Sequence, residues 1–306
     1  MSWYPIALPS LAGRRYLVTG ANAGVGFFTA ARLAGAGAHV VLSGRSPERL
    51  AAAEAAIRAA TAEASVETLV FDLSSLASVE AGAAQLLAAA PLDGVVANAG
   101  MVHTPGARLE SVDGNELVLA TNVLGHFALL GQILGHLSPG ARIILLGSLS
   151  TKLSSFRLDD LQLTRSYDFW RAYAQSKIAT QVFGFELDRR LRAAEVPVAS
   201  IVVHPGYSIS GRTPVVPGVN EPTRGARFAD ALQAAWAQGK HRGAEVPLHA
   251  LTAPGAEGGQ FWGPRLLTRG RPALQTPTRA SADRGTGARF WSFAEQATGR
   301  PFTVGG

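Results

Sequence analysis

Two side chains of this 306-residue sequence have types and a spacing that could carry acid–base chemistry. Tyr173 and Lys177 are four residues apart in a predicted helix, and they therefore lie on one face of it. A lysine ammonium favours the phenolate form of a nearby tyrosine, so it lowers the tyrosine pKa from about 10 toward neutral pH. The Tyr173 hydroxyl could then give a proton to an oxygen that gains negative charge, as a carbonyl oxygen does when hydride reaches its carbon.

Two more polar residues could complete this set. Ser148 follows a predicted strand, where its hydroxyl could bind the reacting oxygen and stabilise the developing charge. Asn122 stands in the middle of a predicted helix, a position that asparagine does not favour. Tyr173 alone could be a half-buried aromatic residue, and Lys177 alone could be a surface charge. The four residues together favour the catalytic interpretation.

A glycine-rich turn joins the first predicted strand, at 15–19, to the first predicted helix, at 24–35. The residues of this turn are Gly20, Asn22, Ala23, Gly24, Val25 and Gly26. Glycines let a phosphate approach the backbone N–H groups at a helix N-terminus. An ordinary strand–helix turn is the alternative. The strand–turn–helix context near the start of the chain favours a site for the phosphates of a dinucleotide.

The second predicted strand, at 39–43, ends next to Gly44 and Arg45. In nucleotide-binding folds the end of this strand meets the adenosine ribose, where an acidic residue would bind the 2′-hydroxyl and an arginine can accept a 2′-phosphate. No Asp or Glu occurs between His39 and Pro47. Arg45 therefore favours NADP(H) over NAD(H), and a solvated surface arginine is the alternative.

The elements that must position these residues alternate along the chain. Strands are expected at 15–19, 39–43, 66–71, 94–98, 142–146, 198–203 and 260–263, and helices at 24–35, 47–62, 76–90, 114–137, 169–194 and 226–238. The strands are nearly continuous apolar runs, typical of parallel strands covered by helices on both faces. We expect an α/β fold, with a Rossmann-type doubly wound parallel sheet of about seven strands flanked by helices.

We expect residues 1–306 to form a single domain of this type. Residues 149–168 and 207–225 break the alternation of strands and helices. Residues 207–225 are rich in Gly and Pro and are expected to form a mobile loop over the site. Residues 264–306 form an Arg/Pro-rich C-terminal extension for which the pattern predicts no position.

The composition is that of a globular protein, with 47% apolar and 16% charged residues. The sequence contains no cysteine, which excludes disulfides, thiolate catalysis and cysteine-ligated metal sites. The seven histidines form no His-x-x-x-His pair, so we expect no metal site. His126 and His204 are expected to pack in the core or in loops.

The net charge of +6 could indicate nucleic-acid binding. The arginines near the C-terminus are dispersed among prolines, glycines and aliphatic residues, so we expect no nucleic-acid partner. Attraction of an anionic cofactor accounts for the charge. No targeting pattern precedes the first strand, and Gly, Pro or charges interrupt the apolar stretches. We therefore expect no transmembrane segment and a cytoplasmic location.

Further motifs follow in order along the chain. Ala97-Asn98-Ala99-Gly100 ends the fourth predicted strand, and Pro205-Gly206 follows the sixth. Together with the glycine turn, Asn122 and the Tyr-x-x-x-Lys pair, they resemble the short-chain dehydrogenase/reductase family from about residue 11 to residue 263. The stretch between Ser148 and Tyr173 is longer than in compact members. It resembles the retinol dehydrogenase and protochlorophyllide reductase branches.

The resemblance implies a nicotinamide cofactor and assigns roles to named residues. Lys177 would also bind the ribose hydroxyls, and Asn122 would hold a water that relays protons between Lys177 and solvent. The implied cofactor contacts outside the glycine turn are Arg45, Asp72, Leu73, Asn98, Ala99, Gly100, Tyr173, Lys177, Pro205, Gly206, Ser208 and Ser210. Ala97, Gly147 and Ser210 depart from the family pattern, which often has Asn, Ser and Thr at these positions.

The expected function is an NADP(H)-dependent oxidoreductase that moves hydride between nicotinamide and a small-molecule carbonyl or alcohol. Phe156, Trp170 and Tyr207 suggest an apolar pocket and a lipophilic substrate. A catalytically silent nucleotide-binding regulatory or scaffold protein is the main alternative. A sugar-nucleotide epimerase is disfavoured by the glycine spacing. A homo-oligomer built from the helices of Asn122 and Tyr173 is possible by resemblance.

Overall fold

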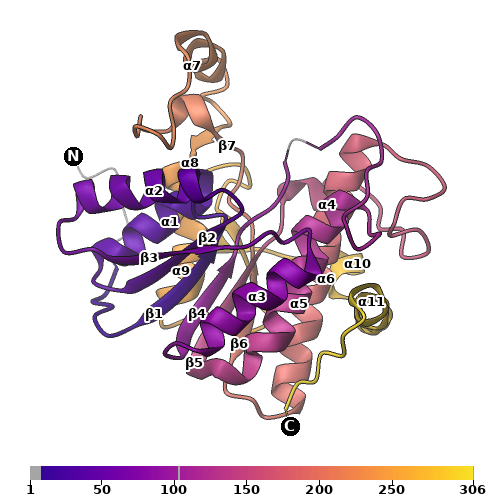
Figure 1. The fold of residues 1–306 in the computed structure, drawn as a ribbon. Helices are drawn as coiled ribbons and strands as arrows, with labels where there is room; N and C mark the ends of the chain where they lie inside the picture. Colours follow the sequence, from indigo (N-terminus) through magenta and orange to yellow (C-terminus); the bar gives the residue numbers. More distant parts are fainter. Residues whose placement is uncertain (1–7, 103, 306) are drawn as a thin grey trace.

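The computed structural model describes residues 8–102 and 104–305 (Figure 1). The strands of its main sheet are β1 (Arg15–Thr19), β2 (His39–Gly44), β3 (Ser65–Val70), β4 (Leu92–Ala97), β5 (Leu137–Leu146), β6 (Ala199–Val203), β9 (Phe261–Pro264) and β10 (Pro272–Leu274). The longer helices are α1 (Gly24–Gly35), α2 (Pro47–Ala60), α3 (Leu76–Leu87), α5 (Gly125–Ile133), α6 (Phe169–Ala193), α9 (Glu245–Thr252) and α11 (Arg284–Thr298).

The eight strands pair in the order β10-β9-β6-β5-β4-β1-β2-β3. Seven of them run parallel, and β10 pairs with β9 in the antiparallel direction. One hydrophobic core lies between the sheet and α3, α5 and α6, and a second lies under α1, α2 and α9. The predicted α/β doubly wound fold is confirmed, and the antiparallel edge strand β10 adds to the expected seven. All parallel strands end at one edge, where such sheets bind ligands.

The long helix predicted at 114–137 is a composite of four pieces. These are α4 (Leu117–Leu119), the π-helical turn η1 (Ala120–Leu124), α5, and the 3₁₀ turn η2 (Leu134–His136). It begins at Leu117 because the Glu116 carboxylate caps it, accepting bonds from the backbone N–H groups of Val118 at 2.9 Å and Leu119 at 2.7 Å. By length and composition the stretch could cross a membrane, yet 78% of its apolar window is buried inside the fold. Its apolarity is therefore that of a core helix.

His126 joins this helix to the first strand. Its imidazole Nε2 lies 2.9 Å from the Thr19 hydroxyl of β1, and its Nδ1 lies 3.2 Å from the Asn122 carbonyl oxygen. The side chain is buried, and burial lowers the pKa of His126 to about 4, with a smaller contribution from the Lys177 ammonium. His126 is therefore a neutral, hydrogen-bonded core residue, as expected from the sequence.

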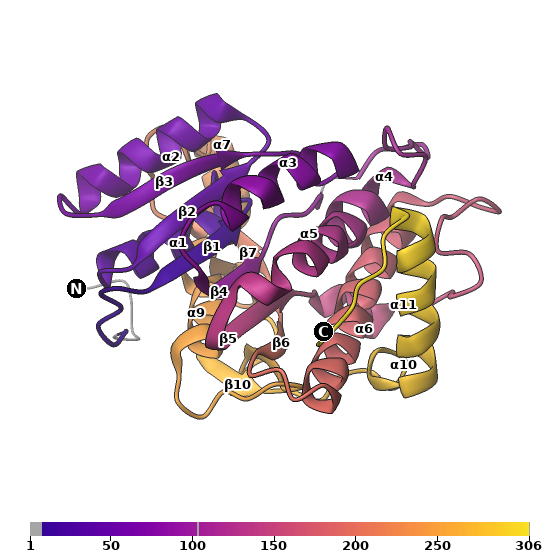
Figure 2. The ribbon, with the colours of Figure 1, turned by 60° about the horizontal axis from the view of Figure 1, so that its bottom comes forward.

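The C-terminal extension folds back onto the helical face of the sheet. It contains β10, the short helix α10 (Arg279–Ala282) and α11. Figure 2 shows α11, in yellow, beside α6. The Asp283 side chain caps α11 by accepting the Thr286 N–H at 2.7 Å, and Gly299 ends it in the left-handed conformation. The segment therefore carries its own start and stop signals.

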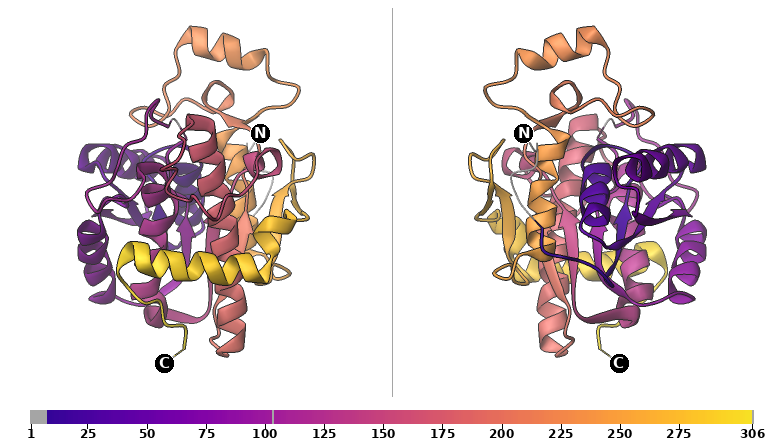
Figure 3. Two further views of the ribbon diagram at one scale, coloured as in Figure 1. Left: turned by 90° about the vertical axis from the view of Figure 1, so that its right-hand side faces the viewer. Right: turned by 90° about the vertical axis from the view of Figure 1, so that its left-hand side faces the viewer.

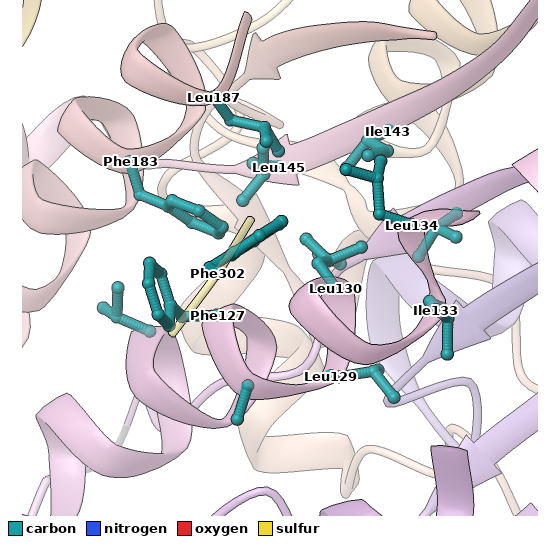
Figure 4. Close-up of a cluster of buried hydrophobic side chains, with 14 of the residues drawn as sticks. Phe127, Leu129, Leu130, Ile133, Leu134, Ile143, Leu145, Phe183, Leu187 and Phe302 are labelled. Carbon is teal, nitrogen blue, oxygen red and sulfur yellow. The ribbon is translucent and has the colours of Figure 1, made fainter. Parts of the chain in front are cut away.

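Trp291 anchors α11 in the core. Its ring centroid lies 5.1 Å from that of Phe127 on α5 and 4.8 Å from that of Phe302. Phe127, Phe183 and Phe302 meet in the same cluster (Figure 4). The chain's own C-terminal residues thus cover this part of α5 and α6. The homo-oligomer that resemblance suggested cannot use this part of the two helices.

The segment after β6 is only partly irregular. Ser208–Ile209 (β7) pairs with Gln238–Gly239 (β8), and α7 (Arg224–Ala231) lies between them. The predicted helix at 226–238 was too long, since α7 ends at Ala231. Residues 238–239 join this small sheet instead, where the Gln238 amide donates to the Pro205 carbonyl at 2.8 Å. Figures 1 and 3 show α7 standing clear above the sheet.

Replacing Trp291 with alanine should destabilise the protein by about 3–5 kcal/mol, because it leaves a cavity among fully buried aromatic rings. Urea unfolding at constant pH measures the change. Trp236→Ala is the matched control, since that tryptophan is 52% exposed, and its effect should stay within about 0.5 kcal/mol. Equal losses in the two variants would contradict the packing described for α11.

The neutral state of His126 predicts a pH dependence of stability. Its folded pKa of about 4 lies below the value of about 6.5 for an unfolded histidine, so the unfolded chain binds the proton first. Stability from this residue is present above pH 6.5 and is lost as pH falls toward 4. Between pH 7 and pH 5, the free energy of unfolding of wild type should therefore fall by about 2 kcal/mol more than that of His126→Gln.

Urea titrations at both pH values measure this difference. Phe127→Leu, a core change without a titratable group, controls for loss of stability alone and should keep the wild-type pH dependence. An unchanged slope in His126→Gln would show that His126 takes up a proton without unfolding the protein.

Candidate active site

Three of the predicted catalytic residues meet at the carboxyl end of β5. The Tyr173 hydroxyl of α6 donates to the Ser148 hydroxyl, with 3.3 Å between the oxygens. The Lys177 ammonium, one turn further along α6, donates to the Leu146 carbonyl oxygen at 2.8 Å. Asp168 caps α6 and so sets its first turn, by accepting the N–H of Arg171 at 2.9 Å. The start of the helix and its tie to β5 together place Tyr173 against Ser148.

The pKa values of this pair differ from the expectation. Burial raises the pKa of Tyr173, and the hydrogen bond to Ser148 opposes that change in part. Burial lowers the pKa of Lys177 to about 8. The net shift is therefore opposite to the predicted lowering by Lys177, because burial of the hydroxyl is its largest cause. Tyr173 is a protonated hydroxyl at neutral pH, and Lys177 is still charged.

Asn122 lies in the π-helical turn η1 and joins the same group of residues. Its Oδ1 accepts the Met101 N–H at 2.7 Å, and its Nδ2 donates to the Ser176 hydroxyl at 2.9 Å. A Cβ atom on Gly100 would lie 3.0 Å from Asn122 Oδ1 and 3.4 Å from Lys177 Nζ. The amide is thus used to hold the loop after β4 beside Lys177. The Asn122 Oδ1 keeps a second lone pair that can accept a bond, so the expected relay water stays a prediction.

The glycine turn has the features that a phosphate requires. Ala23, which precedes α1, provides no side-chain cap, whereas α2 and α6 are capped by Ser46 and Asp168. The first N–H groups of α1 therefore lack a side-chain acceptor, as at anion-binding helix ends. A Cβ atom on Gly26 would overlap the Asn98 amide, and Gly24 has a φ of +63°. The turn residues present here therefore fit a cofactor phosphate.

Thr19 fixes the loop opposite this turn, a role that the sequence did not suggest. The backbone N–H groups of Asn98 and Ala99 both donate to its hydroxyl at 3.0 Å. The Asn98 amide donates to the Thr19 carbonyl at 2.8 Å. His126 contacts the same hydroxyl from the far side. His126 lies four residues after Asn122, on the same helix face, and this spacing is the signal that could have revealed its contact with Thr19.

Two basic residues near the turn were also missed. One is Arg49, which follows Arg45 and lies in the first turn of α2, and both arginines are exposed. With the Asn22 amide oriented to suit its neighbours, its oxygen accepts from Arg49 Nε at 3.2 Å and from Nη2 at 3.0 Å. The other is Lys240, whose side chain approaches the turn: its Cδ would lie 3.8 Å from a Cβ atom on Gly24.

Lys240 is half-buried, and burial, together with Arg49, lowers its pKa, while Asp230 opposes the change. The sequence contains only three lysines, and all three lie at this edge of the sheet, since Lys152 belongs to the short turn after Ser148. That scarcity, in a chain whose other basic residues are arginines, was the available signal.

The remaining predicted cofactor contacts lie at the same edge of the sheet, but not all of their side chains are available to a ligand. Asp72 accepts bonds from the Ser74 N–H at 2.9 Å and hydroxyl at 2.8 Å, which shapes the turn into α3. The side chain of Leu73 packs in the core. Ser208 donates its hydroxyl to the Pro205 carbonyl at 2.9 Å, and the side chain of Ser210 is half-buried. Leu73 and Ser208 are thus committed elsewhere through their side chains.

The segment after β6 packs against the turn between β9 and β10, where the Tyr207 N–H donates to the Thr268 carbonyl. Gly206 has a φ of +70°, and a Cβ atom there would overlap the Thr268 carbonyl. The buried His204 accepts the Gly206 N–H at 3.3 Å on Nδ1, and burial lowers its pKa to about 4. His204 is therefore a packing residue, as expected. Gly147, which departs from the family pattern, leaves room for Gln181, because a Cβ atom would lie 2.9 Å from that side chain.

Residues 14–215 match the family model described as short chain dehydrogenase. The chain is 38% identical to the polyprenol dehydrogenase of Mus musculus over 209 residues, which cover 66% of this chain and 62% of that protein. It is 32% identical to retinol dehydrogenase 14 of Mus musculus over 266 residues, which cover 82% of this chain and 78% of that protein. The match thus leaves more than a third of the polyprenol dehydrogenase outside it.

Solved structures agree with these relatives. An uncharacterised protein from Mycobacterium paratuberculosis superposes with a TM-score of 0.79 and 34% identity, covering 97% of both chains. A short-chain dehydrogenase from Burkholderia cenocepacia in complex with NADP superposes with a TM-score of 0.63 and 25% identity, covering 83% of this chain and 97% of that chain. The protein belongs to the short-chain dehydrogenase/reductase family, as an oxidoreductase similar to the retinol dehydrogenase branch.

Proposed function

We propose that the protein is an NADP(H)-dependent carbonyl reductase or alcohol dehydrogenase in which Tyr173 is the general acid and base. The observation that carries this proposal is the Tyr173–Ser148 contact at the carboxyl end of β5. It lies at the sheet edge that also holds the turn suited to a dinucleotide phosphate. A nicotinamide cofactor, when bound there, supplies or accepts the hydride.

The residues of the chain manage the proton and the charge. The Ser148 hydroxyl binds the carbonyl oxygen and orients it beside Tyr173. As hydride reaches the carbonyl carbon, the Tyr173 O–H gives its proton to the oxygen, and the alcohol forms. The Lys177 ammonium stabilises the phenolate that remains, which then regains a proton from solvent. Burial raises the pKa of Tyr173, so the hydroxyl carries its proton at neutral pH and can serve as the acid in reduction.

In this proposal Asn122 is a positioning residue, which holds other groups in place. Its amide holds the loop at 100–101 against Lys177, and the ammonium is held in turn by the Leu146 carbonyl. Both contacts keep Lys177 close to Tyr173 without the exchange of a proton.

The cofactor preference follows from charge at the end of β2. No acidic side chain occurs between His39 and Pro47 to bind a ribose 2′-hydroxyl, whereas Arg45 and Arg49 both stand beside the turn. Paired guanidinium groups suit a 2′-phosphate, because they can donate several charge-assisted bonds. A similar short-chain dehydrogenase, from Burkholderia cenocepacia, is solved with NADP.

We propose a lipophilic aldehyde or ketone as the substrate class. Trp170 stands beside Tyr173, with 6.3 Å between their ring centroids, and is 45% exposed. Tyr207, 41% exposed, follows the Pro-Gly turn at the same edge. Aromatic surfaces beside the reacting groups would bind an apolar chain or ring. Similar proteins are named for polyprenol and retinol.

Tyr173→Phe should reduce kcat for decanal or retinal reduction by about 10²–10⁴-fold, because no general acid remains. NADPH binding, followed by nicotinamide fluorescence, should stay close to wild type. Tyr167→Phe is the matched control, since its hydroxyl donates to the Pro105 carbonyl at 3.0 Å and not to the site. A wild-type protein that binds NADPH but reduces no carbonyl in a broad panel would favour the scaffold alternative.

Arg45→Ala and Arg49→Ala should each weaken NADPH binding by about 10-fold or more, from the loss of a charge-assisted bond, and leave NADH binding nearly unchanged. The ratio of the two dissociation constants, measured by fluorescence, tests this. Arg58→Ala on the far end of α2 is the control, because that arginine pairs with Glu54. Equal weakening of NADPH and NADH would show that neither arginine reads the 2′-phosphate.

A further inference from the structure

The exposed aromatic residues are gathered at one end of the protein. Among the described residues, the aromatic side chains with large exposure are Phe169, Trp170, Tyr207, Phe228 and Trp236. Phe169 and Trp170 begin α6, and the other three lie between β6 and β8. All five therefore lie at the carboxyl end of the sheet, the end that also holds Ser148 and Tyr173. Scattered exposed apolar residues are normal, but a gathered set marks an interaction surface.

Helix α7 is attached to the protein by its polar side. The Asp230 carboxylate accepts the Gly211 N–H at 2.6 Å, and the Gln233 side chain accepts the Tyr207 hydroxyl at 2.6 Å. At about 100° per residue, Phe228 and Leu232 lie on the opposite side from Asp230. They are 71% and 69% exposed, and no residue of α7 is buried.

This arrangement reverses the usual one. A surface helix of a globular protein buries its apolar side and exposes its polar side. Figure 3 shows α7 standing at the top of the molecule, with nothing above it. The apolar side of α7 is therefore available to a partner outside the chain.

A second apolar element lies at the same end, in the turn between β9 and β10. Leu266 and Leu267 are 61% and 43% exposed, and Leu267 has a φ of 62°, which is costly for a side chain with a Cβ atom. The turn is tied to the segment after β6, because the Tyr207 N–H donates to the Thr268 carbonyl at 2.7 Å. Two tied elements at this end thus carry exposed leucine and aromatic side chains.

Basic residues flank both apolar elements. Arg224 and Arg227 lie on α7, and Arg265 and Arg269 lie on either side of the two leucines; all four are exposed. Apolar and aromatic tips among arginines are typical of elements that sit at the boundary of headgroups and acyl chains. A second copy of the chain fits less well, because a twofold contact through this surface would bring the arginines together.

We infer that the carboxyl end of the sheet docks on a lipid bilayer with anionic headgroups, through α7 and the β9–β10 turn. Apolar side chains of Phe228, Leu232 and Leu266 enter the boundary, and the arginines meet the lipid phosphates. The inference concerns binding and does not require turnover. If the proposed function holds, docking places the opening of the active site where a lipophilic substrate is dissolved.

Vesicle flotation of the full chain tests this directly. Wild type should float with vesicles of phosphatidylcholine and phosphatidylglycerol, should bind phosphatidylcholine alone more weakly, and should be released by salt. Phe228→Ser with Leu232→Ser should weaken binding at least about 10-fold, given the apolar area withdrawn from lipid. The control is Leu87→Ser with Leu274→Ser, which removes two exposed leucines elsewhere, at 44% and 59% exposure. It should bind as wild type does.

Several outcomes would overturn the inference. Wild type could fail to float, or the Phe228/Leu232 variant could float as well as wild type. Dimerisation of wild type that is lost in this variant would instead assign the surface to a second copy. The Phe228/Leu232 variant could also bind vesicles as wild type does but lose turnover of a water-soluble aldehyde when no vesicles are present. That result would show that α7 covers the bound substrate and does not bind lipid. Tyr173→Phe should float normally, which separates docking from the proposed function.

Discussion

The hydrogen bond from the Lys177 ammonium to the Leu146 carbonyl is the contact on which the geometry of the site depends. It ties α6 to the last residue of β5, and Ser148 follows two residues later. Tyr173 lies one turn before Lys177, so the same bond brings its hydroxyl to Ser148. Burying an ammonium is costly, and the lowering of its pKa to about 8 reflects that cost. A charge held at the edge of the core thereby fixes the relation between strand and helix.

The sequence was sufficient for the fold and for most of the site. Alternating apolar runs and helical patterns predict a parallel sheet, and a parallel sheet brings all strand ends to one edge. Ser148, Tyr173 and Lys177 could therefore be placed together from spacing alone. The ends of helices were predicted less well. The Glu116 side chain caps a helix that begins later than predicted, and Gln238, which was predicted to be helical, lies in a short strand.

What could not be predicted depends on contacts between distant parts of the chain. Spacing puts Lys177 beside Tyr173, but it does not reveal how deeply the Tyr173 hydroxyl is buried, and burial raises its pKa where a lowering was predicted. Lys240 reaches the glycine turn from more than two hundred residues away. Trp291 packs against Phe127 and Phe302 from a segment rich in Arg and Pro that has no clear periodicity. These links arise only when the sheet has formed.

One apolar surface of the protein, on α5 and α6, is covered by the chain itself, whereas another, on α7, is exposed. The C-terminal helix α11 covers the apolar side of α5 and α6 with buried aromatic rings. At the carboxyl end of the sheet the relation is reversed, because α7 is held by Asp230 and Gln233 and presents Phe228 to the outside. The same chain thus completes its core with its last residues and leaves its active-site end free for a partner.

The most direct test of the central claim is to follow the transferred hydrogen. NADPH deuterated at the position of hydride transfer would be incubated with wild-type protein and a panel of lipophilic aldehydes and ketones, and the products examined by mass spectrometry. The account predicts deuterium on the carbinol carbon of the alcohol, one for each NADPH oxidised. Oxidation of NADPH without deuterium in any alcohol would contradict it, because the Ser148–Tyr173 site would then not be directing hydride to a carbonyl carbon.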